Sequence, residues 1–238
     1  MSSNPAAHAD APPPWSLTGR GFISLLRFPE PLSLQEAGIP PLVQATGQPS
    51  RYCWMMAVDY TDSAVGPYHE LLFIPGSLHF AHSGRLLTIG RIFVSSMASV
   101  VNGRANWGIP KDEAEFQFAD TAPGQTQIAL RQDAQEPFAE LQYQHRRLSL
   151  PFTTAILPSR LHTLGQEWEG QEFRYTPTAS GQISPAKLVH ARADGLRFPA
   201  LQRATPLLSV AVKRFSMTFP VANIYPLGSK NDSLSRAA

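Results

Sequence analysis

Lys111 is a candidate nucleophile because of its residue type and its neighbours. The chain has 238 residues with 20 lysines and arginines, and the lysines are Lys111, Lys187, Lys213 and Lys230. An arginine can replace a lysine as a surface charge, but it cannot form an imine with a carbonyl compound because its guanidinium stays protonated. Lys111 follows Trp107, Ile109 and Pro110, which can shield its amine from water. The alternative is a lysine whose stem lies on Trp107 while its amine stays in water.

Several segments, in the same order along the chain, resemble those of one family. They are residues 14–22, 22–28, 58–60, 65–71, 103–111 and 215–220, and together they span about residues 13–221. The most specific of them is a Gly-Arg turn followed by Pro110 and Lys111. On these segments the chain resembles the acetoacetate decarboxylase superfamily, in which the imine-forming lysine directly follows that proline.

The resemblance implies a role for three residues. Lys111 corresponds to the imine-forming lysine, Glu70 to the catalytic acid that follows Tyr68, and Arg27 to the arginine on the first strand. A planar guanidinium such as that of Arg27 can hold a substrate carboxylate. The alternative for Arg27 is an ion pair with Glu30 or a more distant acid, and Glu70 alone would be read as a surface acid.

Three more residues are candidate substrate contacts. Arg104 precedes Lys111 in a predicted turn, where an arginine can bind substrate or, alternatively, tie down backbone carbonyls. Tyr68 and Trp107 are expected to form pocket walls, for which core packing is the alternative.

Two departures from the family pattern affect the expected chemistry. Asp112 stands where the family has a second lysine. A carboxylate about 5 Å from the amine would favour the ammonium by about 3 kcal/mol, but alternation along an extended segment directs Asp112 away from Lys111. Burial would then lower the pKa of Lys111 from about 10.4 towards 7. A second family acid has no counterpart at residues 53–56, so we expect a more apolar pocket.

Length and composition favour one compact domain. The chain is 43% hydrophobic and 16% charged, with a net charge of +2, and its arginines are too dispersed for a nucleic-acid surface. We expect residues 1–14 to be disordered, residues 15–227 to form a single domain and residues 228–238 to be a flexible tail. Neither a secretory signal nor a membrane-spanning apolar run is present, so the expected location is the cytoplasm. The single cysteine, Cys53, is expected to be a small buried hydrophobe.

Short β-rich segments separated by proline, glycine and aspartate predict a mainly β fold with a few short helices, arranged as an antiparallel barrel. The resemblance implies the same architecture. The predicted strands are residues 21–28, 52–60, 68–74, 86–94, 115–119, 127–131, 138–145 and 207–219. Residues 32–37 and 96–106 are predicted helices, and residues 179–185 read as the most loop-like interior stretch.

Other residue patterns are weak evidence for a metal site or for another class of enzyme. His79 and His82 have a spacing that could hold a metal, but no third ligand follows nearby, so no metal is expected. The sequence contains no nucleophile elbow, phosphate-binding loop or dinucleotide fingerprint. No diffusible cofactor is implied, because the lysine itself would serve as the electron sink.

The sequence therefore predicts a lysine-imine enzyme, a carboxy-lyase acting on a small oxo acid. Decarboxylation of a β-keto acid such as acetoacetate is the first expectation. An aldolase or dehydratase reaction through the same imine, or a non-catalytic barrel that binds a small molecule, are the alternatives. The expected partner is the oxo acid, with no nucleic acid or membrane, and analogy alone suggests a homo-oligomer.

Overall fold

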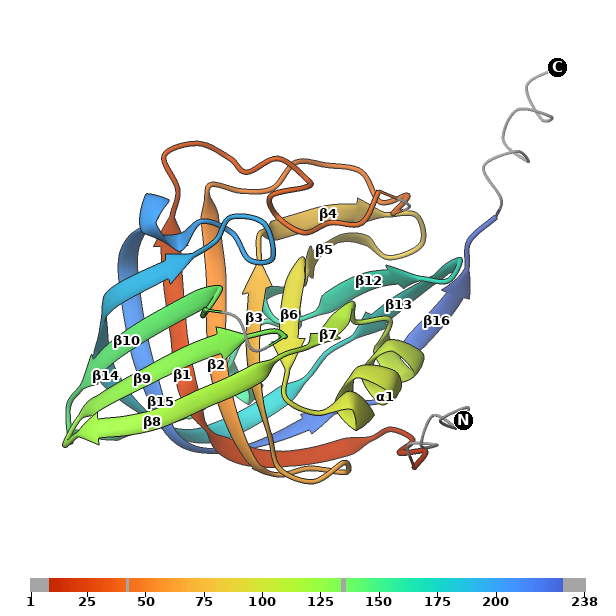
Figure 1. Ribbon diagram of the computed structural model, residues 1–238. Helices are drawn as coiled ribbons and strands as arrows, with labels where there is room; N and C mark the ends of the chain where they lie inside the picture. The colour runs from red at the N-terminus through yellow and green to blue at the C-terminus, as the bar shows by residue number, and fades with distance from the viewer. Residues whose placement is uncertain (1–8, 42, 134–135, 229–238) are drawn as a thin grey trace, which may run out of the picture.

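A computed structural model describes residues 9–41, 43–133 and 136–228, in which two β-sheets accompany one α-helix and three short 3-10 helices (Figure 1). The larger sheet has the order β7-β6-β3-β2-β1-β15-β14-β10-β9-β8, and β11 pairs with β14. Its strands are β1 (Trp15–Arg27), β2 (Tyr52–Asp62), β3 (Tyr68–Ile74), β6 (Arg91–Val94), β7 (Lys111–Glu113), β8 (Glu115–Ala122), β9 (Gln125–Arg131), β10 (Ala139–His145), β11 (Leu150–Thr153), β14 (Thr178–Ala193) and β15 (Thr205–Phe219). The 3-10 helices are η1 (Thr154–Ile156), η2 (Ser159–Leu161) and η3 (Leu201–Arg203).

The larger sheet curls into a half-barrel. Its two end strands, β7 and β8, are consecutive in the chain with Ala114 between them. Figure 1 shows β8, β9 and β10 crossing in front of β1 and β2. The ring of Phe22 on β1 lies 4.1 Å from the ring of Tyr143 and 6.4 Å from that of Phe118, so the enclosed space is filled by a first core.

A second core lies against the other face of the larger sheet. The smaller sheet has the order β16-β13-β12-β5-β4, with β4 (Gly76–Phe80), β5 (Gly84–Thr88), β12 (Leu164–Trp168), β13 (Gln171–Tyr175) and β16 (Asn223–Pro226). Residues of this sheet and of the helix α1 (Met97–Trp107) pack with residues of the larger sheet in one buried cluster. The cluster includes Phe173 from the smaller sheet, Ile92 from the larger sheet and Trp107 from α1.

Strand β3 separates the two cores by simple alternation. Leu71 and Phe73 belong to the first core, whereas Tyr68 and Leu72 belong to the second. Side chains alternate between the faces of a strand, so Glu70, two residues from each of Tyr68 and Leu72, is directed into the second core. Burying each large apolar side chain contributes about 1.5–3 kcal/mol, which fixes this register strongly.

The helix α1 is delimited by a cap at each end. Ser96 has extended backbone angles and its Oγ accepts a hydrogen bond from the Ser99 N–H, as an N-cap does. Gly108 adopts a left-handed conformation with φ 63°, and its N–H donates to the Arg104 carbonyl. No helix among the described residues has both the length and the apolar character needed to cross a membrane.

The mainly β prediction is confirmed, and so is most of the strand pattern. β3 has the predicted bounds, and residues 96–106 form α1 shifted by one residue. Residues 86–94 are divided between β5 and β6, because the chain passes there from the smaller sheet to the larger one. Between the two strands, a Cβ at Gly90 would collide with the Ala37 carbonyl oxygen. The predicted strands did not include β4, β7, β11, β12, β13, β14 or β16.

Three local predictions are wrong. Residues 179–185 lie in the long strand β14 rather than in a loop. Residues 32–37 form hydrogen-bonded turns, with the Ala37 N–H donating to the Ser33 carbonyl, and no helix. Residues 9–14 are packed, because the Ala11 N–H donates to Asn102 Oδ1 and Trp15 Nε1 donates to the Ala11 carbonyl, each at 2.8 Å. The rest of the predicted disordered segment, residues 1–8, lies outside the described residues, as does the predicted tail from residue 229.

Candidate active site

Lys111 lies at the start of β7, opposite Ile92 on β6, and its side chain is buried in the second core. Its Nζ donates hydrogen bonds to Glu70 Oε2 at 3.0 Å and to Ser99 Oγ at 2.9 Å. The same nitrogen lies 5.3 Å from the centre of the Tyr68 ring. The amine is therefore held by a carboxylate, a hydroxyl and an aromatic face.

Glu70 is as buried as Lys111, each being 4% exposed. Its second oxygen, Oε1, accepts a hydrogen bond from the Tyr60 hydroxyl at 3.1 Å. Tyr60 lies opposite Tyr68 in the β2–β3 register, and their rings are 4.6 Å apart. Both carboxylate oxygens thus have a partner, which orients the group towards the amine.

Sequence reasoning missed Tyr60 and Ser99 as site residues. Tyr60 falls in a segment that resembles the family, but nothing in the sequence aims its hydroxyl at Glu70. Ser99 lies three residues after the N-cap of α1 and four before Gly103, so it shares a helix face with the lysine stem. That helical spacing is the only signal that could have identified it.

Gly103 makes room for the lysine. A Cβ built on Gly103 would lie 2.8 Å from Lys111 Cδ and 2.9 Å from Cε. These distances are shorter than a carbon–carbon contact allows, so the stem of Lys111 lies directly against the helix backbone. A glycine that weakens the helix interior is therefore explained by the position of Lys111.

The amine faces a small cavity with a volume of about 20 Å³, which is room for about one water molecule. Tyr60, Tyr68, Glu70 and Lys111 supply its polar groups. The remaining wall is apolar and consists of Trp15, Leu17, Leu72, Ile89, Ile92, Trp107, Ile109 and Phe219. Tyr68 and Trp107 thus lie where a pocket wall was expected.

The electrostatics of the site differ from the sequence expectation. Burial lowers the pKa of Lys111, but the Glu70 carboxylate and Tyr68 outweigh burial, so the pKa lies above the ordinary lysine value. Burial also raises the pKa of Tyr68 to about 12. The expected pKa near 7 is wrong, and Lys111 rests as an ammonium ion paired with Glu70.

Arg104 lies beside the site but does not line the cavity. Its Nη2 donates to the Lys111 carbonyl at 2.6 Å and to Asp112 Oδ1 at 2.9 Å. Its guanidinium carbon lies 5.1 Å from the centre of the Trp168 ring. Arg104 therefore ties down a carbonyl, and Asp112 is directed outward, as the alternation along β7 predicts.

Comparison with known proteins identifies the architecture. No protein-family model matches the chain, and no curated protein matches it either. Among solved structures, acetoacetate decarboxylase from Legionella pneumophila is similar with a TM-score of 0.63 and 14% identity, covering 94% of this chain and 92% of that one. The chain has the acetoacetate decarboxylase fold. At this identity the likeness concerns the fold alone.

Two further structures share the acetoacetate decarboxylase fold with this chain. An acetoacetate decarboxylase-like enzyme from Sphingomonas wittichii has a TM-score of 0.63 and 13% identity, covering 94% of this chain and 97% of that one. The enduracididine biosynthesis enzyme MppR has a TM-score of 0.58 and 16% identity, covering 92% of each chain. It was solved with the condensation product of pyruvate and imidazole 4-carboxaldehyde.

Within this acetoacetate decarboxylase fold, Arg27 lies away from the cavity. It is the last residue of β1, pairs with Tyr52 and Thr205, and is exposed. The cavity touches β1 near its start, at Leu17, and ten residues of extended strand span about 33 Å. The substrate contact that the resemblance implied for Arg27 is not available at this cavity.

Residues 53–56, on which the expectation of a more apolar pocket depended, do not line the cavity. Trp54 and Met56 occupy the stretch where a second acid has no counterpart, and both pack against the second core. For the His79 and His82 pair, no group of three potential metal ligands occurs in the described part of the chain. His82 instead stacks on Tyr225, with ring centres 5.3 Å apart.

Proposed function

We propose that this protein is a lysine-imine enzyme that decarboxylates a small β-keto acid such as acetoacetate. The observation that carries the proposal is the buried contact of Lys111 Nζ with Glu70 Oε2 and Ser99 Oγ, at 3.0 and 2.9 Å. A buried amine beside a proton acceptor is the arrangement that nucleophilic catalysis by lysine requires.

Glu70 supplies the proton transfers. It accepts a proton from the Lys111 ammonium as the ketone arrives, and the neutral amine then attacks the carbonyl carbon. Glu70 returns the proton to the hydroxyl group of the adduct, which leaves as water and gives a protonated imine. Ser99 fixes the position of Nζ throughout these transfers.

The apolar wall favours the loss of carbon dioxide. A substrate carboxylate among Trp107, Ile109 and Phe219 loses its hydration, and its charge is dispersed as the electrons of the breaking bond move into the imine. The resulting enamine takes a proton from water at carbon, and a second water molecule hydrolyses the imine, which releases the ketone product and frees the Lys111 amine. Because the cavity of about 20 Å³ is smaller than the substrate, this wall has to move outward on binding.

A carbon–carbon bond-forming or dehydrating reaction is the second candidate. The MppR structure holds a condensation product of pyruvate and an aldehyde, and the same protonated imine supports such chemistry. A non-catalytic barrel that binds a small molecule is the third candidate, and it predicts no covalent adduct.

Borohydride trapping tests the proposal. The protein is incubated with acetoacetate or with pyruvate, reduced, and digested for mass mapping, with Lys111→Arg as the matched variant. We expect an adduct on Lys111 with acetoacetate, together with release of carbon dioxide. An adduct without carbon dioxide release would favour the condensing or dehydrating enzyme. Absence of an adduct across a panel of ketones would contradict the imine mechanism.

A further inference from the structure

A β-bulge brings together three cations on the half-barrel, away from Lys111. In the pairing of β1 with β15, Gly19 lies opposite Phe215 and Gly21 opposite Val212. The single residue Arg20 therefore faces two residues, Lys213 and Arg214. A bulge of this kind places two residues against one and redirects their side chains.

The neighbours of the bulge show which face the two cations occupy. Val212 and Phe215 are three residues apart, yet both pack in the second core. Strict alternation would have placed them on opposite faces. The extra residue lies between them, so neither Lys213 nor Arg214 packs in the second core. Both lie beside Arg20 instead.

Arg20, Lys213 and Arg214 line one surface pocket with a volume of about 710 Å³. Thr18, Thr61 and Gln182 also line it and add uncharged hydrogen-bonding groups. None of its lining residues lines the cavity at Lys111. The two spaces are therefore separate, although β1 contributes to both.

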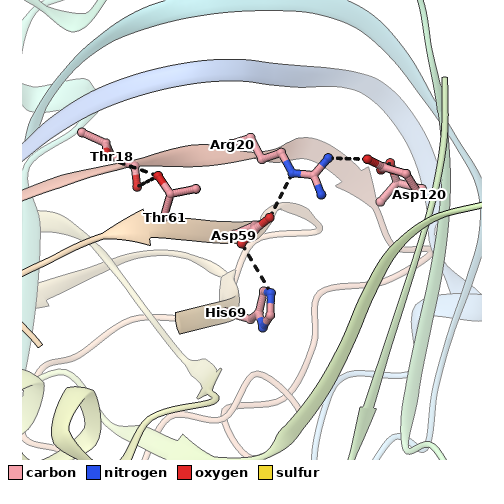
Figure 2. Close-up of polar contacts among 7 residues, drawn as sticks. Thr18, Arg20, Asp59, Thr61, His69 and Asp120 are labelled. Carbon is pink, nitrogen blue, oxygen red and sulfur yellow. Dashed lines mark hydrogen bonds and ion pairs between the residues drawn. The ribbon is translucent and has the colours of Figure 1, made fainter. Parts of the chain in front are cut away.

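Arg20 is paired with two carboxylates, and neither of them lines the pocket. Figure 2 shows Arg20 between Asp59 and Asp120, with Nε donating to Asp59 at 2.9 Å and Nη1 donating to Asp120 at 2.6 Å. Asp120 also accepts a hydrogen bond from Thr126, and Asp59 lies 3.4 Å from His69 Nε2. Arg20 Nη2 takes part in neither ion pair.

Lys213 has a neutral partner in place of a carboxylate. Its Nζ lies 2.6 Å from His145 Nδ1. In the described part of the chain, neither Lys213 nor Arg214 has a carboxylate within ion-pair distance. Burial lowers the pKa of Lys213, although the Asp120 carboxylate opposes this effect. The pKa of His145 is lowered first by burial and second by the positive charge of Lys213. Positive charge thus exceeds negative charge at this pocket.

We propose that this pocket is a second ligand site, which binds a small polar molecule through an oxyanion, a carboxylate or a phosphate, held by Lys213 and Arg214. Charge-assisted hydrogen bonds from ammonium and guanidinium groups are the strongest that a protein offers to such a group. Arg20 Nη2 can donate a further hydrogen bond to the same oxyanion. Thr18 and Thr61, whose hydroxyl oxygens lie 3.3 Å apart, line the pocket beside the cations. The site does not depend on the imine chemistry at Lys111.

Calorimetric titration tests the site with inorganic phosphate and with succinate, each against sodium chloride at matched ionic strength. We expect saturable binding of at least one oxyanion and none of chloride. Lys213→Gln and Arg214→Gln should each weaken binding by about tenfold or more. Lys187→Gln is the matched control, because Lys187 is exposed on β14 and does not line the pocket. Binding of phosphate alone or of succinate alone identifies the anionic group.

A second readout follows His145 in NMR spectra. The charged groups that face His145 are Lys213, Asp120 and Arg20. An anion on Lys213 offsets the charge that disfavours protonation of His145, so the pKa of His145 should rise on binding. Equal heats with chloride, an unchanged His145 titration, or full binding by folded Arg214→Gln protein would each overturn the proposal. Arg214 is exposed, so that variant keeps the test informative if Lys213→Gln does not fold.

Discussion

At the scale of single residues, the proposed reaction depends on the balance between burial and the Glu70 carboxylate at Lys111. Burial alone favours the neutral amine, whereas Glu70 favours the ammonium, and the second effect prevails in the resting pair. Glu70 thus holds Lys111 protonated and is also the group placed to remove the proton. A nucleophile with a raised pKa can still react when its acceptor lies 3.0 Å away.

Glu70→Gln separates these two roles. Without the carboxylate, burial is opposed by Tyr68 and no longer by Glu70, so the pKa of Lys111 should fall. Direct acylation of Lys111 by acetic anhydride should then begin at lower pH than in the original protein. Imine formation with acetoacetate should nevertheless slow by about a hundredfold, because the proton acceptor is lost. The two rates are measured by peptide mapping over a pH series.

Asp112→Asn is the control for Glu70→Gln. It also removes a carboxylate close to Lys111 in sequence, but Asp112 is directed outward and pairs with Arg104. Its acylation profile and trapping rate should match those of the original protein. An unchanged acylation profile in Glu70→Gln would contradict the electrostatic role given to Glu70.

At the scale of secondary-structure elements, α1 positions the lysine through Gly103. Gly103→Ala should favour the helix by about 1 kcal/mol in propensity, but its Cβ would displace the lysine stem. Overpacking costs about 1–3 kcal/mol, so we expect a small change in the free energy of unfolding. Trapping on Lys111 should fall at least tenfold. Chemical denaturation and borohydride trapping measure the two effects.

Ala105→Gly is the matched variant for that experiment. Ala105 is exposed on the same helix, so the change weakens α1 by about 1 kcal/mol without touching Lys111. We expect lower stability with unchanged trapping. If both variants trapped equally well, Gly103 would have no role in positioning the lysine.

Strand β14 shows why some elements could not be predicted. Residues 179–185 contain Gly181 and Pro185, which are typical of a loop. Along one edge of β14, β11 pairs up to Ile183 and β10 pairs from Ala186, so Pro185 falls between two partners where no N–H is needed. A Cβ at Gly181 would collide with the Arg214 carbonyl. Both residues fit a long strand only because of tertiary neighbours that the local sequence does not reveal.

At the scale of the whole molecule, the two sites differ in how far the sequence could predict them. The short segments that resemble the superfamily indicated Glu70 and Lys111 as site residues, but not the direct contact between them. Arg27 was misplaced because local sequence does not show which end of a long strand meets the cavity. The arginines looked dispersed along the sequence, yet the bulge on β15 gathers Lys213 and Arg214 beside Arg20.

The free energy of unfolding should depend on pH, because several groups across the molecule have a pKa in the folded chain that differs from the ordinary value. The pKa values of His69 and His145 are lowered, chiefly by burial. Between the ordinary histidine pKa of about 6.5 and these lower values, the unfolded chain binds more protons than the folded one. The free energy of unfolding should therefore fall as the pH drops below about 6.5, by at most about 1.4 kcal/mol per pH unit for each histidine.

A second decrease should follow at lower pH. Hydrogen bonds from Ser33 lower the pKa of Glu36, and Arg20 lowers that of Asp120 despite burial. Their stabilising contribution is present above the ordinary carboxyl pKa of about 4 and is lost as the pH falls through the folded values. Urea denaturation at pH 7.5, 5.5 and 3.5 measures both stages. His145→Gln should reduce the first stage, whereas His190→Gln, at an exposed position on β14, should leave it unchanged. A free energy of unfolding that stays constant from pH 7.5 to 5.5 would show that the two histidines protonate alike in the folded and unfolded chains.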